Sequence, residues 1–172
     1  MNKQFLKVGL VALMAGIYSA GASAAGPVNG SAEVTVASAV TLTESTGMNF
    51  GIMVPGTVAT TVSLNSALAH GRNVSAGDGT LVTGGTVAAG AFQIGGTTGA
   101  TVSIAVADLG DLGALVFTPA TAAATNLGAT HTIDAVAANN ILYVGGDVVI
   151  PTGTAAGNYA NAAAYSVTVN YQ

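Results

Sequence analysis

The last residues of the chain alternate most clearly between large apolar side chains and small or polar ones. From 159 to 172, one register holds Tyr159, Tyr165, Val167, Val169 and Tyr171, whereas the other holds only alanine, serine, threonine, asparagine and glutamine. Successive side chains of a β-strand point to opposite faces, so this pattern predicts one long strand with one face on a core. Such a strand at the end of a chain either closes a sheet or is paired by a further segment.

A second alternating stretch, residues 31–43, predicts the first strand, and its apolar face carries Val34, Val36, Val40 and Leu42. Between these two stretches lie short runs rich in valine, isoleucine and threonine, separated by glycine, asparagine and aspartate. No window has a helical period with caps, although the alanine runs at 122–124 and 135–138 can form helical turns. Residues 145–147, Gly-Gly-Asp, are typical of a hairpin turn. The pattern therefore predicts an all-β sandwich or barrel.

The N-terminus has the organisation of a secretory signal peptide. Lys3 and Lys7 precede an apolar run at 8–17, and Ala22-Ser23-Ala24 is a small-residue cleavage signal. We therefore predict that residues 1–24 are removed, with cleavage between Ala24 and Ala25. Residues 25–172 would then form one exported domain. The apolar run is too short to span a bilayer, and no later segment is long enough, so we expect no membrane span after cleavage.

The charge balance excludes several classes of partner. After cleavage only one basic residue, Arg72, remains against seven acidic residues. A surface with one cation cannot neutralise phosphates, which argues against nucleic acid and against anionic lipid. Cysteine is absent, so disulfides, zinc–thiolate sites and thiol catalysis are excluded. Few charges separate the chain from its neighbours, and this composition favours self-association.

Side chains with catalytic or metal-binding chemistry do not gather in the sequence. His70 and His131 lie in polar surroundings, where exposed loop histidines are the simpler interpretation. Asp78, Asp108 and Asp111 accompany glycines as turn residues do, without the dense ligand spacing of a calcium loop. No G-x-S-x-G motif and no paired carboxylates in an apolar context are present. We therefore predict no catalytic residue, no metal site and no cofactor, and expect that the protein is not an enzyme.

Several segments together resemble a known family. Residues 48–56 (MNFGIMVPG) resemble an LdFGtivpG signature, and residues 91–104 resemble an aF.itG..ga.ysi segment. Residues 142–146 are similar to l.VGg, and residues 156–159 with 167–171 are similar to aG.Y…vtVnY. In this order and spacing, they resemble a secreted bacterial family of domains of unknown function. That family is similar to the spore coat protein U group and to chaperone–usher pilus subunits.

This resemblance implies a fimbrial-type subunit at the cell surface. Such subunits are immunoglobulin-like antiparallel β-sandwiches that lack their final strand. A periplasmic chaperone fills the gap in transit, and the N-terminal extension of the next subunit fills it after passage through an outer-membrane usher. Tyr171 stands at the place of the family's penultimate tyrosine, and Tyr165, Val167 and Val169 supply its alternation. The expected partners are therefore like subunits, a chaperone and an usher, and the expected location is the periplasm and then an extracellular fibre.

Two interpretations of residues 31–43 remain open. The segment is either a donor whose Val34, Val36, Val40 and Leu42 insert into a neighbouring subunit, or the intramolecular first strand of a self-complete domain. The first predicts a structural subunit of a fimbria or surface fibre, assembled by β-strand complementation. The second predicts a self-complete secreted β-sandwich that acts as an adhesin or as a coat or binding module.

Overall fold

The computed structural model describes residues 31–66 and 71–172. The predicted signal peptide, its cleavage site at Ala24 and Ala25, and His70 lie outside the described residues. The chain divides into two units, one ending at Thr35 and the other comprising residues 36–172. The described part of the first unit, residues 31–35, is exposed and has no regular secondary structure.

The second unit is built from short strands. In chain order these are β1 (Thr41–Thr46), β2 (Ile52–Val54), β3 (Thr60–Leu64), β4 (Arg72–Ala76), β5 (Thr80–Val82), β6 (Gly90–Gly95), β7 (Thr101–Asp108), β8 (Val116–Pro119), β9 (Thr130–Thr132), β10 (Ile141–Val144), β11 (Gly146–Ile150) and β12 (Tyr165–Tyr171). Two single-turn 3-10 helices, η1 (Ala122–Ala124) and η2 (Ala137–Asn140), occur where the alanine runs predicted helical turns.

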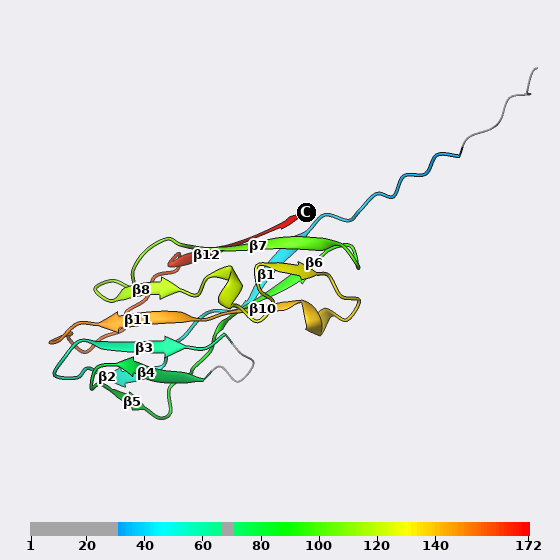
Figure 1. Cartoon of the computed structure of the whole chain (residues 1–172). Helices are drawn as coiled ribbons and strands as arrows, with labels where there is room; N and C mark the ends of the chain where they lie inside the picture. Colours follow the sequence, from blue (N-terminus) through cyan, green and yellow to red (C-terminus); the bar gives the residue numbers. More distant parts are fainter. Residues whose placement is uncertain (1–30, 67–70) are drawn as a thin grey trace, which may run out of the picture. The chain divides into compact units, whose positions relative to one another are not determined.

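All pairs of named strands are antiparallel. Their sheets have the orders β1-β6-β10, β4-β3-β11-β8, β12-β7-β9 and β2-β5. In Figure 1, β12 runs beside β7, and β11 lies between β3 and β8. The predicted all-β antiparallel sandwich is confirmed.

The interior contains two clusters of buried apolar side chains. The first is centred on β3, β8 and β11 and comprises Phe50, Val62, Leu64, Leu115, Phe117, Val148, Ile150 and Ala164. The second is centred on β6, β7, β10 and β12 and comprises Ile94, Val102, Ile104, Ile133, Leu142, Val144 and Val169. Met48 and Tyr165 pack against both clusters and so join them.

The predicted first strand at 31–43 is wrong in its extent. Strand β1 begins only at Thr41, because residues 31–40 have no partner strand among the described residues. The four valine and leucine side chains of the predicted face are divided accordingly. Val34 and Val36 are 85% and 88% exposed, whereas Val40 and Leu42 pack against the second cluster.

The predicted extent of the last strand, residues 159–172, is also wrong. Strand β12 begins only at Tyr165. Ahead of it, the side chain of Asn161 accepts a hydrogen bond from Ala163 N and donates one to Asp111 O. These local bonds hold a turn, so Tyr159 belongs to a loop and not to β12. The alternation from Tyr165 onward is confirmed, with Val169 buried and Thr168 and Asn170 exposed.

The predicted hairpin at 145–147 is wrong as well. The flanking strands do not pair, because β10 pairs with β6 and β11 pairs with β3 and β8. The chain instead passes from one sheet to another at Gly145. A Cβ atom at this position would collide with the carbonyl oxygen of Leu64 and lie 2.8 Å from Ser66 N.

This crossing predicts a specific sensitivity to side-chain volume. We expect Gly145→Ala to lower the free energy of unfolding by about 1–3 kcal/mol, because the added methyl group must displace backbone atoms of a neighbouring strand. Gly71→Ala is the control, because a Cβ atom there meets nothing within 4 Å. Urea unfolding of both variants measures the difference, and equal stabilities would show that the crossing is not tightly packed.

Candidate functional site

Strand β12 has one face on the core and one edge without a partner. Val169 belongs to the second cluster, and Tyr165, Val167 and Tyr171 pack against it. On one edge β12 pairs with β7 along its whole length, from Tyr165 opposite Asp108 to Tyr171 opposite Val102. Among the described strands, none pairs with its other edge.

The hydrogen bonds at the two ends of β12 show which backbone groups face this free edge. Ala164 O accepts a hydrogen bond from Leu109 N, and Gln172 N donates one to Thr101 O. Hydrogen-bonded pairs alternate in an antiparallel ladder, so the even-numbered residues bond to β7. The N–H and C=O groups of Tyr165, Val167, Val169 and Tyr171 therefore point away from β7, while their side chains point into the core.

Tyr165 joins the two clusters through its ring, and its hydroxyl is buried between them. Its ring packs edge-on against Phe92, with centroids 6.0 Å apart, and at a tilt against Phe117. Its Oη atom is buried and has no hydrogen-bond partner among the described residues. Burial, with a smaller contribution from the negative charge of Glu44, raises the pKa of Tyr165 to about 12.

Tyr171 differs from Tyr165, because its hydroxyl both donates and accepts a hydrogen bond. It donates a hydrogen bond of 2.6 Å to Ser38 O and accepts one of 2.8 Å from Thr97 N. Ser38 N in turn donates a hydrogen bond of 2.8 Å to Thr97 Oγ1. We call this set of three hydrogen bonds the Tyr171 lock. It fixes the chain at Ser38, three residues ahead of β1.

Residues 31–37, which we call the N-terminal arm, are exposed throughout and have no regular secondary structure. Val34 and Val36 are the two most exposed large apolar side chains among the described residues. Their spacing places both on one face of an extended segment. The arm therefore carries apolar side chains that the described residues of its own chain do not bury.

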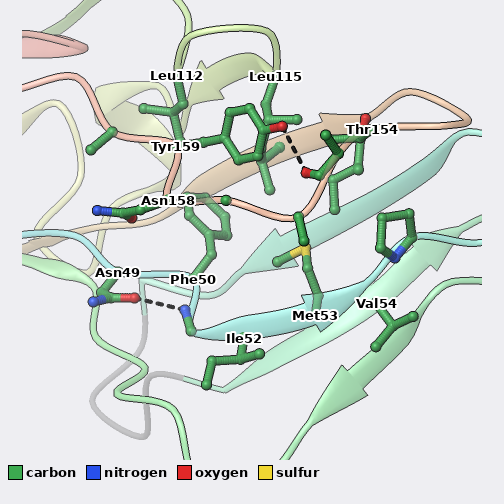
Figure 2. Close-up of a pocket in the computed structure, with 18 of the residues that line it drawn as sticks. Asn49, Phe50, Ile52, Met53, Val54, Leu112, Leu115, Thr154, Asn158 and Tyr159 are labelled. Atoms are coloured by element: carbon green, nitrogen blue, oxygen red, sulfur yellow. Dashed lines mark hydrogen bonds between the residues drawn. The ribbon is translucent and has the colours of Figure 1, made fainter.

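A cleft lies between two of the segments that carry the family resemblance. Residues 48–55 form one wall and residues 154–161 form the other, and the volume is about 870 Å³. Figure 2 shows Phe50 and Met53 pointing into the cleft toward Tyr159, Leu112 and Leu115, with Ile52 and Val54 pointing away. Consistent with this, Ile52 and Val54 are about half exposed.

Hydrogen bonds within each wall shape this cleft. Tyr159 Oη donates to Ala155 O at 2.8 Å, which closes the loop on itself, and Asn49 Oδ1 accepts from Gly51 N at 2.7 Å (Figure 2). None of the described residues that line the cleft is charged. The cleft can therefore accept an uncharged, largely apolar group, and it offers no acid, base or ion-pair partner.

Arg72 supports one wall of the cleft from behind. Its guanidinium donates hydrogen bonds to the carbonyl oxygens of Phe50, Ile52 and Val82. A planar guanidinium can satisfy several fixed acceptors at once, which a lysine ammonium does less well. The one basic residue outside the predicted signal peptide is therefore used to fasten β2 and β5, rather than to hold a carboxylate.

The remaining polar residues considered in the sequence make local bonds. His131 Nε2 lies 2.9 Å from Asn140 Oδ1. Asp108 accepts from Gly110 N and Asp111 accepts from Phe117 N, each at 3.0 Å. Hydrogen bonds from the Thr57 hydroxyl and from Val58 N lower the pKa of Asp78. Within residues 31–66 and 71–172, no three histidine, cysteine or acidic residues gather as metal ligands would.

Sequence reasoning missed the cleft, the Tyr171 lock and the hydrogen bonds of Arg72 to backbone carbonyl oxygens. It singled out residues 48–56 and 156–159 but gave no reason to place them opposite each other, because they are far apart in the chain. The apolar Phe50, Met53 and Tyr159 within uncharged, glycine-containing segments were the available signal. Nothing in the sequence indicated that Tyr171 reaches Ser38.

Comparison with known proteins adds a family match. The family model described as Domain of unknown function (DUF4402) matches residues 40–171. No curated protein and no solved structure matches the chain. In the described part of the chain, no helix has the length and apolar character needed to cross a bilayer.

The unpartnered hydroxyl of Tyr165 leads to a test of stability against pH. A buried hydroxyl without a partner costs about 1–3 kcal/mol, so we expect Tyr165→Phe to raise the free energy of unfolding by about 1 kcal/mol at neutral pH. The folded-state pKa of about 12 lies above the ordinary value of 10.0. The unfolded chain therefore loses this proton at a lower pH than the folded chain does. The part of the folding free energy that depends on the proton is fully present below about pH 10 and is lost as the pH rises through about 12.

Urea titrations of both proteins at pH 7, 9 and 11 measure this effect. The advantage of the phenylalanine variant should widen between pH 9 and pH 11, because only the native protein has this hydroxyl to titrate. The other tyrosines are common to both proteins and cancel in the comparison. A variant that is less stable at neutral pH would mean that the hydroxyl has a partner.

Proposed function

The chain belongs to the DUF4402 family, and we propose from the geometry of its N-terminal arm and of β12 that it is a structural subunit of an extracellular fimbria or surface fibre. Copies of the chain assemble by β-strand complementation, in which the arm of one copy adds to the free edge of β12 in the next copy. No chemical step is required, because the subunit binds its neighbour through apolar burial and backbone hydrogen bonds.

The observation that carries this proposal is the exposure of Val34 and Val36, at 85% and 88%, on an arm without secondary structure. Fully burying a valine contributes about 1.5–3 kcal/mol, so leaving both in water forgoes several kcal/mol. Both side chains lie on one face of an extended segment, so a single groove or strand edge can bury them together. A second copy supplies a surface for it without any further component.

The acceptor in this proposal is the free edge of β12. Tyr165, Val167, Val169 and Tyr171 direct unpaired N–H and C=O groups along it, as the ladder with β7 implies. An extended arm satisfies these groups as an added strand, and each hydrogen bond made contributes about 0.5–1.5 kcal/mol net. The low charge of the chain, with Arg72 engaged in backbone contacts, leaves little repulsion between copies.

The cellular route follows from the same proposal. A subunit with a free strand edge needs protection before assembly, because such an edge promotes aggregation. The resemblance to chaperone–usher pilus subunits supports a periplasmic chaperone as the temporary partner and an outer-membrane usher as the assembly site. The N-terminal pattern supports export with removal of residues 1–24. The final location is then the cell surface.

This function predicts that the arm is required for assembly and not for folding. We expect the full exported chain to form ladders on unboiled SDS gels. The double variant Val34→Asp, Val36→Asp should abolish them and give soluble monomer, because a charge cannot enter an apolar interface unpaired. Its melting transition should remain within a few degrees of that of the unassembled native chain, because the described residues do not bury either side chain.

Val136→Asp is the matched control, because Val136 is 56% exposed and lies outside both the arm and β12. It makes the same chemical change and should leave the ladders intact. Ladders that persist in the double variant, or a native chain that is monomeric under all conditions, would contradict assembly through the arm.

A second candidate function has one observation in its favour, the uncharged cleft of about 870 Å³. A pocket of this size with apolar walls is typical of ligand sites. The protein would then be a secreted β-sandwich that acts as an adhesin or binding module. Its ligand would present an uncharged and largely apolar group to Phe50, Met53 and Tyr159.

The uncharged fluorescent dye N-phenyl-1-naphthylamine tests this candidate. A binding module should take up the dye saturably, with one site per chain, and Met53→Arg should reduce the affinity at least tenfold by placing a charge inside the cleft. The Val136→Asp variant should bind as the native chain does. Dye binding that is absent, or equal in the native chain and in Met53→Arg, would count against the cleft as a ligand site.

A further inference from the structure

We infer that the Tyr171 lock keeps β1 in its own domain, so that the donated segment ends before Ser38. In the described part of that segment, residues 31–37, the large apolar side chains are Val34 and Val36. This inference rests on the proposed function and makes it more specific. The sequence left open whether residues 31–43 are a donor or an intramolecular first strand, and this inference divides that segment at Ser38. Tyr171 acts as a positioning residue in this scheme, through the chain that it holds.

The geometry of the lock leaves none of its polar groups unpaired. Tyr171 Oη donates to Ser38 O and accepts from Thr97 N, and Ser38 N donates to Thr97 Oγ1. Gly96 permits this arrangement, because a Cβ atom there would lie 2.6 Å from Tyr171 Oη and 2.8 Å from the Cδ1 atom of Ile133. The lock thus ties the end of β12 and the residues after β6 to one point ahead of β1.

On the C-terminal side of the lock, the chain is built into the domain. Strand β1 pairs with β6 from Thr41 opposite Gly95 to Thr46 opposite Ala91. Val40 and Leu42 pack against the second cluster, which includes Ile94 and Val169. Removing this strand would expose the cluster and one edge of β6, so apolar burial and backbone pairing both oppose its exchange.

On the N-terminal side, the arm has no such ties. No hydrogen bond joins residues 31–37 to another described residue, and the first such bond along the chain is made by Ser38, the residue that follows the arm. Donating Val34 and Val36 therefore leaves the Tyr171 lock and the pairing of β1 with β6 intact. A donor comprising all of residues 31–43 would instead break the Tyr171 lock and the pairing of β1 with β6.

A designed disulfide between β1 and β6 distinguishes the two donors. Thr43 and Gln93 are directly opposed in the antiparallel pair, where Cα atoms lie about 4.5–5.5 Å apart, within the range of a disulfide. The chain contains no cysteine, so the pair Thr43→Cys and Gln93→Cys can bond only to each other or to the same sites in another copy. For this experiment the full chain carrying both cysteines is expressed with export to an oxidising periplasm, where the disulfide can form during assembly.

If β1 stays in its own domain, the disulfide closes within each chain. Boiling in SDS without reductant should then release single subunits, although unboiled samples retain the ladder. If residues 31–43 are exchanged as a whole, the disulfides join neighbouring copies. The ladder then survives boiling and collapses only with reductant, which would overturn the inference while leaving the proposed function intact. A native chain without any ladder would overturn both.

The role of the lock itself is tested in the same disulfide background. Thr97→Val removes the acceptor of Ser38 N, and Tyr171→Phe removes the hydroxyl. Each should speed amide exchange at Ser38 or Thr97 at least tenfold and should produce some boiling-resistant, reducible ladder as β1 is released. Thr97→Ser, which keeps the hydroxyl, and Ser38→Ala, which keeps the backbone atoms, should behave as the parent does. If the first two variants also match the parent, Tyr171 does not hold β1 in place.

Discussion

The unpaired edge of β12 is the constraint on which the rest of this structure depends. A backbone N–H or C=O group removed from water needs a hydrogen-bond partner, and β12 has a described partner on one side only. Its side chains nevertheless lie on the core, where Val169 is 8% exposed. The strand thus combines a buried face with an edge that can accept another strand, and the proposed assembly follows from this combination.

Apolar contacts and backbone hydrogen bonds are the main interactions that stabilise the domain. It contains no disulfide, and its one basic residue outside the predicted signal peptide binds carbonyl oxygens rather than a carboxylate. Tyr165 and Met48 join two apolar clusters that would otherwise be separate, and Gly145 lets the chain cross between sheets without a collision. A fold built in this way leaves few charges to oppose association, which is consistent with the proposed assembly.

Tyr165 and Tyr171 show how similar positions acquire different tasks. Both lie on the same face of β12 and both pack against the second cluster. The Tyr165 hydroxyl is buried without a partner, so its ring serves packing. The Tyr171 hydroxyl reaches Ser38 and Thr97, so it fixes a segment far away in the chain. Their shared alternation predicts one face for both, but hydrogen-bond partners depend on which loop reaches each end of the strand.

The sequence by itself determined the all-β class, the apolar face of β12, the absence of disulfides and the helical turns at the alanine runs. These features follow from side-chain period and composition, which are local. Tertiary structure alone decided where strands begin and end, because an alternating segment becomes a strand only beside a partner. Residues 31–40 and 159–163 have no partner strand among the described residues. It also decided that residues 48–55 and 154–161 face each other across a cleft, since sequence period carries no information about which distant segments meet.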